Sequence, residues 1–289
     1  MTGTDCGAME VENMVHSDSM SPTSLGIWLK LSRRWELKTS LTVGSTRRSQ
    51  QTLTSSEVCV FLVQTLEESL QGCQSLSGVH TADQLLLSTI IVQTLAVMFR
   101  ENEVEPARLD LLSTKRGALA SRMLLALICD PELQTQNQGS QTDREALLAE
   151  YLDAACSLLF ELLLLGHNAS RCSPADNFLS VGWILRVLQP HPHLTSFVGY
   201  QAQQVVLVLS DLQEPFLSPL QSVLLSQRCR LLLACLQYST QLAQHLWAHF
   251  REEFRYFVKL SCAEQKLPPH YPISQPTVRL VEQILTLHR

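Results

Sequence analysis

Hydrophobic residues recur every three or four positions over most of this chain, which is the spacing of one face of an α-helix. In the first such segment Val58, Phe61 and Leu62 share a face, and Ser55 stands where a helix N-cap is expected. Polar loops, many of them with proline, separate the later segments. The pattern predicts about nine helices, with starts near residues 55, 81, 106, 142, 176, 197, 219, 241 and 277.

Proline and glycine mark several of the expected helix ends. Pro106 and Pro219 stand at helix starts, where a residue without an N–H is tolerated. Gly166 stands where a C-terminal glycine in the left-handed conformation is expected. The apolar run that begins at Pro219 is long for one helix, so a break is predicted near residues 238–240.

Taken in pairs, the predicted helix starts recur at intervals of roughly 40 residues, the period of armadillo and HEAT repeats. No internal sequence identity accompanies this period, so a helical bundle without repeats stays open. The best strand candidate, Gln204–Leu209, lies inside a segment with helical spacing, and one strand cannot form a sheet. The prediction is an all-α, armadillo/HEAT-like stack.

Composition supports helices and divides the chain in two. Hydrophobic residues make up 45% of the chain and aromatic residues 6%, and the apolar residues are mostly leucine, a strong helix former. Residues 1–54 are instead rich in Ser, Thr, Met and Gly, with little periodicity. We expect a poorly ordered tail over 1–54 and a helical-repeat domain over 55–289.

Charge and cysteine usage indicate an intracellular protein. The net charge of −5 gives no overall attraction to nucleic acid, so direct nucleic-acid binding is not expected. The nine cysteines are scattered and form no CxxC pair, which is typical of the reducing cytosol or nucleus. The N-terminus has no signal-peptide pattern, and the longest apolar runs, Ala118–Cys129 and Ala154–Leu165, are too short to span a membrane.

The sharpest candidate chemistry is a pair of histidines, His245 and His249, which fall on one helix face. Two histidines followed by Glu252 or Glu253 can hold zinc, but the general base of an HExxH motif is missing. The other interpretation is an amphipathic helix with two polar histidines. Because no nucleophile, nucleotide-binding or zinc-protease motif occurs, we expect neither an enzyme nor a cofactor.

A second histidine pair, His191 and His193, alternates with Pro190 and Pro192. Both residues are candidate metal ligands, and both are also typical of an exposed loop, which is the favoured interpretation.

Two groups of aromatic residues are candidate partner-binding sites. In the tail, Trp28 and Trp35 alternate with basic residues, which suggests a partner-binding peptide, a phosphate contact or simply a solvated tail. Near the C-terminus a second group occupies one predicted helix, and its alternative role is packing against the last helix. This group consists of Trp247, Phe250, Phe254, Tyr256 and Phe257.

From Ser55 to Arg289, the paired Leu-rich helices with short polar loops and proline at helix starts resemble armadillo and HEAT repeat proteins. The segment 226–257 (SQRCRLLLACLQYSTQLAQHLWAHFREEFRYF) is similar to the closing part of the meiosis inhibitor protein one family. This resemblance implies a non-catalytic nuclear scaffold in meiotic double-strand-break formation and chromosome synapsis. Such a scaffold would bind other proteins through a helical groove or surface.

Overall fold

The computed structural model describes residues 55–71, 82–100, 106–131, 141–172, 178–211 and 215–287. The chain divides into two units, Met1–Val58 and Cys59–Arg289, and the description below concerns the second. The predicted tail over 1–54, with Trp28 and Trp35, lies outside the described residues.

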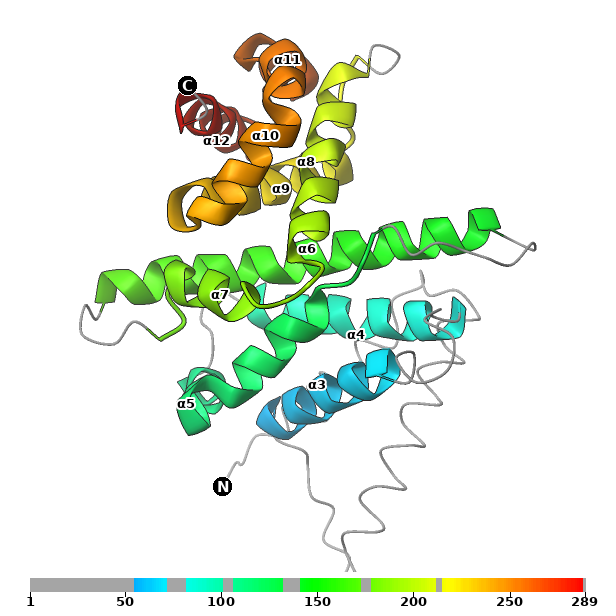
Figure 1. Ribbon diagram of the computed structural model, residues 1–289, viewed down its shortest axis with the longest axis vertical. Helices are drawn as coiled ribbons and strands as arrows, with labels where there is room; N and C mark the ends of the chain where they lie inside the picture. The colour runs from blue at the N-terminus through cyan, green and yellow to red at the C-terminus, as the bar shows by residue number, and fades with distance from the viewer. Residues whose placement is uncertain are drawn as a thin grey trace, which may run out of the picture. The chain divides into compact units, whose positions relative to one another are not determined.

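Every regular element within these ranges is an α-helix, so the all-α prediction is confirmed (Figure 1). The described part of the chain contains ten helices: α3 (Ser55–Gln71), α4 (Ala82–Arg100), α5 (Pro106–Leu127), α6 (Gln141–Cys172), α7 (Val181–Leu188), α8 (Leu194–Ser210), α9 (Pro219–Tyr238), α10 (Thr240–Phe257), α11 (Leu260–Lys266) and α12 (Ser274–Leu287).

The predicted break near residues 238–240 is confirmed, because Ser239 separates α9 from α10 and its side chain accepts a hydrogen bond from the Leu242 N–H. The start of α9 is also as predicted. Pro219 is in the first turn, and Ser218 and Gln221 form a reciprocal capping box. The short helix α11 was not predicted, and its seven residues give too little periodicity to detect.

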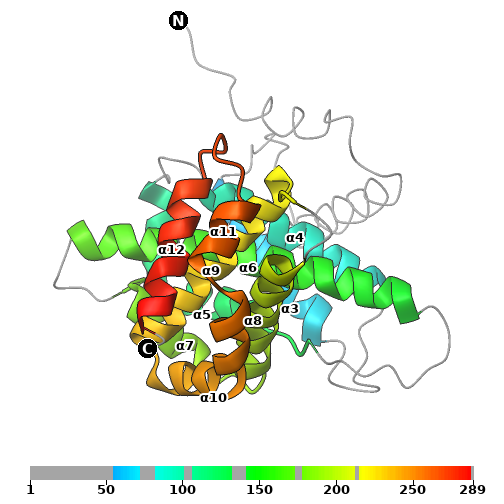
Figure 2. The same ribbon diagram turned by 90° about the horizontal axis from the view of Figure 1, so that it is seen from above.

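Regular armadillo-like stacking is not confirmed. The described helices range from 7 to 32 residues in length. The most extensive helix pair joins α4 to α6, and the next joins α9 to α12. Figure 2 shows α12 beside both α9 and α11. Unequal helices with contacts that skip several neighbours along the chain do not reveal a repeated unit.

The core centres on α6. Leu152, Leu159 and Leu162 are buried on this helix, which packs most extensively against the apolar helix α4. Tyr151 is fully buried and donates its hydroxyl to the carbonyl oxygen of Ala126 at 2.8 Å. Each buried leucine contributes about 1.5–3 kcal/mol, so this layer supplies much of the folding free energy.

One described helix, α4, is long and apolar enough to cross a membrane by length and composition alone. In this structure 44% of its apolar window is buried, mostly against α6. Buried core helices meet the same test, so the observation is weak support for a membrane span.

At two glycines the helices depart from the predicted course. The helix predicted from Pro106 onward is interrupted at residues 114–117, where Gly117 has a φ of +80° and a Cβ there would overlap the Phe178 ring. Gly166 does not end α6, which continues to Cys172. A Cβ at Gly166 would instead clash with the backbone carbonyl of Leu179, so this glycine permits a close approach of the chain before α7.

A buried polar cluster ties α6, α8 and α9 together. Arg228 on α9 is 5% exposed and donates to the Asp153 carboxylate on α6 at 2.5 Å and to the Gln201 side-chain oxygen on α8 at 3.2 Å. Gln201 in turn donates to the Leu152 carbonyl oxygen at 3.3 Å. Since a buried charge without partners is costly, this cluster favours one arrangement of the three helices.

Candidate functional site

A cavity of about 320 Å³ opens between α6, α7, α9 and α12. This volume is near the lower end of the range for ligand pockets, about 300–1,000 Å³. The cavity therefore has room for a single side chain or a small ligand. Its polar lining residues are His167, Arg230, Gln237, Tyr238 and Gln283, and its apolar ones are Leu163, Val181, Leu233 and Ala234.

The lining residues of α9 and α6 lie on one face of each helix. Arg230, Leu233 and Ala234 on α9 are followed by Gln237, so these residues occupy positions i, i+3, i+4 and i+7 of one helix face. On α6, Leu163 and His167 are four residues apart and share a face in the same way. One face of each helix therefore lines the cavity.

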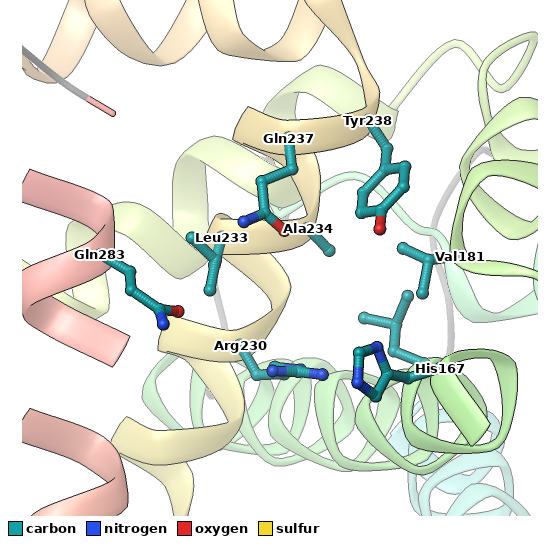
Figure 3. Close-up of a pocket in the computed structure, with 9 residues that line it drawn as sticks. His167, Val181, Arg230, Leu233, Ala234, Gln237, Tyr238 and Gln283 are labelled. Atoms are coloured by element: carbon teal, nitrogen blue, oxygen red, sulfur yellow. The ribbon is translucent and has the colours of Figure 1, made fainter. Parts of the chain in front are cut away.

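The polar lining groups are rich in hydrogen-bond donors, and no carboxylate is among the lining residues that the structure describes. Figure 3 shows the Arg230 guanidinium extending into the cavity toward the His167 ring, with the Tyr238 hydroxyl directed into the same space. Val181, the first residue of α7, also lines the cavity, so the positive end of a helix dipole borders it. The electrostatics of the site favour an anionic group.

The two arginines of α9 have different environments. Arg228 and Arg230 are two positions apart and therefore point to opposite sides of the helix. The Asp153 carboxylate pairs with Arg228. Among the described residues no carboxylate pairs with Arg230, and neither α7 nor α9 contains an Asp or Glu residue. Arg230 thus brings to the cavity a positive charge that no carboxylate of the described residues pairs with.

His245 and His249 lie together on α10, as predicted from their spacing. Their ring centroids are 4.3 Å apart, and His249 Nδ1 lies 3.0 Å from the His245 carbonyl oxygen. Burial, with the neighbouring His249 ring, lowers the pKa of His245. In the described ranges no group of three His, Cys, Asp or Glu residues is placed to hold a metal ion. The pair alone offers fewer ligands than a zinc site needs.

The aromatic residues of α10 do not form one surface stripe. Phe254 is 1% exposed and belongs to the core, and Phe250 is partly buried. Trp247, Tyr256 and Phe257 are exposed. Trp247 and Tyr256 are separated by nine positions of about 100° each, which places them on opposite sides of the helix. Whether any of them contacts a partner stays a prediction.

His191 and His193 occupy the turn before α8. The His193 backbone N–H donates to His191 Nδ1 at 3.3 Å, and His193 Nδ1 lies 3.5 Å from the Asp130 carboxylate. Burial lowers the pKa of His191, and the adjacent His193 adds to the effect. These contacts describe a local turn with one carboxylate neighbour.

Comparison with known proteins identifies the family. A family model described as "Protein of unknown function (DUF4551)" matches residues 52–287. The chain belongs to this family. It is 33% identical over 252 residues to the human "Uncharacterized protein C12orf56", a match that covers 81% of this chain and 40% of the relative. The mouse homologue is 35% identical over 252 residues, covering 81% of this chain and 47% of its own length.

The chain therefore spans less than half the length of the curated relatives it matches. No solved structure matches it.

The resemblance to armadillo/HEAT proteins and to the meiosis inhibitor protein one family was wrong. Neither the DUF4551 model nor the relatives carry such a name. The physical reason lies in the segment 226–257 that suggested it. Leu231, Leu232 and Cys235 in this segment are buried in the core of α9. Leucine at such spacing reflects core packing, which many unrelated helical proteins share.

Proposed function

We propose that residues 59–289 form a non-catalytic protein-binding module, in which the cavity between α6, α7, α9 and α12 receives a side chain of a partner protein. The observation that carries this proposal is Arg230, which projects into the cavity without a carboxylate partner among the described residues. Arginine is one of the three residue types that most often contribute large binding energies at protein interfaces.

The surroundings of the cavity support a protein partner. Tyr238 lines the cavity and is 54% exposed, so part of its ring is available to a second surface. Leu287, one turn beyond Gln283 on α12, is also exposed. Tyrosine and arginine are enriched where proteins bind one another, and an apolar rim excludes water from such contacts.

The lining residues also support a binding role over a catalytic one. His167 and Tyr238 are the described lining residues of types used in general acid–base catalysis, and no Ser, Thr, Cys, Asp or Glu is among the described lining residues. Nucleophilic catalysis requires a nucleophile within hydrogen-bond reach of a base. Six described cysteines are free thiols, which favours a reducing, intracellular location.

The proposal is tested by quantitative affinity purification of the full tagged chain and two charge-reversal variants. Arg230→Glu alters the cavity, whereas Arg251→Glu is a matched control on the exposed surface of α10. We expect a set of proteins captured by the wild type and by Arg251→Glu that is lost from Arg230→Glu. Identical captured sets for all three proteins, or no specific capture, would contradict the proposal.

A further inference from the structure

We infer that the cavity recognises a carboxylate, and specifically the side chain of an aspartate or glutamate in the partner protein. This inference rests on the proposed function and names the chemical group that enters the site. Its starting point is the charge of the wall, because Arg230 is not neutralised by a described carboxylate and α7 and α9 contain no acidic residue.

The donors around Arg230 suit the two oxygens of a carboxylate. A carboxylate accepts up to about four hydrogen bonds, and a guanidinium can donate two of them in parallel. Figure 3 shows the Tyr238 hydroxyl of α9 and the His167 ring of α6 facing the space into which Arg230 extends, whereas Gln283 lines the cavity from α12, on the other side of the α9 ribbon. Donors from separate helices fix the orientation of an anion more firmly than one flexible arginine does.

The apolar part of the lining favours an amino-acid side chain over a free inorganic anion. Leu163, Val181 and Leu233 supply aliphatic surface beside the polar groups. The methylene groups of aspartate or glutamate can pack there, and each buried methylene contributes about 0.8 kcal/mol. Acetate has only one methyl group that could contact this aliphatic surface, and inorganic phosphate has no apolar group.

The number of arginines in the cavity lining favours a carboxylate over a phosphorylated residue as the bound group. Proteins that recognise phosphorylated segments use clusters of arginines, because a phosphate carries nearly two negative charges. Arg230 is the single arginine among the lining residues that the structure describes. One guanidinium matches the single charge of a carboxylate.

The test uses the full chain labelled with 3-fluorotyrosine, in which the Tyr238 fluorine resonance is assigned by its loss in Tyr238→Phe. The probes are blocked tripeptides with a central glutamate, glutamine or phosphoserine, together with acetate and inorganic phosphate. We expect the glutamate peptide to shift the Tyr238 resonance saturably, with the glutamine peptide, acetate and phosphate each at least about tenfold weaker. Arg230→Gln should abolish the shift, and Arg251→Gln should leave it unchanged.

Three results would overturn the inference: equal binding of the glutamine peptide, tighter binding of the phosphoserine peptide, or equal binding of acetate or phosphate. The spectrum of Arg230→Gln without ligand reports whether that variant is folded, because the chain contains five tyrosines whose resonances depend on packing. If Arg230-dependent partners are captured but glutamate is not preferred, this inference fails and the proposed function stands. If glutamate is preferred but no partner depends on Arg230, the proposed function fails.

Discussion

Arg228 and Arg230 lie on opposite sides of α9 and illustrate how position decides the role of a residue. Arg228 is held by Asp153 and Gln201 in the interior, where its charge organises three helices. Arg230 faces the cavity and has no described carboxylate beside it. The sequence contains both arginines in the same Leu-rich run, and the tertiary pairing of Arg228 with Asp153 and Gln201 distinguishes them.

Replacing Arg228 should therefore destabilise the fold, whereas replacing Arg230 should not. Arg228→Met leaves the partly buried Asp153 without its partner and is expected to cost about 2–4 kcal/mol of unfolding free energy. The double variant Asp153→Leu/Arg228→Met should recover most of that loss. Arg230→Gln removes a charge with no described carboxylate partner and should stay within about 0.5 kcal/mol of wild type. Urea denaturation followed by circular dichroism measures all three, and equal costs for Arg228→Met and Arg230→Gln would refute the role of the cluster.

The buried cysteines provide a second prediction at this scale. Burial raises the pKa of Cys156, Cys229 and Cys235 from 9.0 to about 12. Native protein at pH 8 should therefore leave these three unmodified by iodoacetamide, whereas the partly exposed Cys262 reacts. Peptide mass spectrometry with denatured protein as the control measures the labelling. Fast modification of Cys156 in native protein would show that this part of the core opens readily.

The same pKa shifts give a sign for the pH dependence of stability. The fold favours the neutral thiols, since their folded pKa lies above the unfolded value. Their stabilising contribution is fully present below about pH 9 and is lost as the pH rises toward 12. The urea concentration at the unfolding midpoint should thus decrease as the pH is raised from 8 to 11. A midpoint that rises over this interval would contradict the assignment.

At the scale of elements, the sequence was a good guide to helices and a poor guide to their interruptions. Pro219, with Ser218 before it, predicted the start of α9 because capping and proline chemistry are local. The role of Gly166 was predicted wrongly and the interruption at Gly117 was not predicted, because both depend on tertiary neighbours, Leu179 and Phe178. A glycine that ends a helix and a glycine that admits another backbone segment look alike in sequence.

Alanine substitutions at two helical glycines test this distinction. Gly166→Ala should destabilise the protein by about 1–3 kcal/mol, because its Cβ meets the Leu179 carbonyl and the backbone must shift. Gly182→Ala is the matched control, since its Cβ would lie 3.7 Å from Tyr238, an ordinary contact. This control should be neutral or stabilising by up to about 1 kcal/mol, as expected for alanine in a helix. Thermal unfolding of both variants is the measurement, and a neutral Gly166→Ala would disprove the close approach.

At the scale of the whole molecule, the sequence predicted the all-α class but not the cavity. Helical periodicity shows which face of α9 is apolar, but it does not show that α6, α7 and α12 converge on Arg230. One signal was available, namely that Arg230 lies on a helix without any acidic residue. The aromatic residues of α10 were instead predicted as a partner-binding surface. The core position of Phe254 shows that aromatic content alone does not identify a binding surface.

The most direct test of the central claim is site-specific photo-crosslinking in cells. A benzophenone amino acid replaces Gln237 in the cavity or, as the control, the exposed Gln203 on α8, in the full chain. We predict a defined adduct from the Gln237 position alone, with the crosslinked partner peptide containing an aspartate or glutamate, and loss of this adduct in Arg230→Glu. No adduct at Gln237, or one that persists unchanged in Arg230→Glu, would contradict the assignment of this cavity as a protein-binding site.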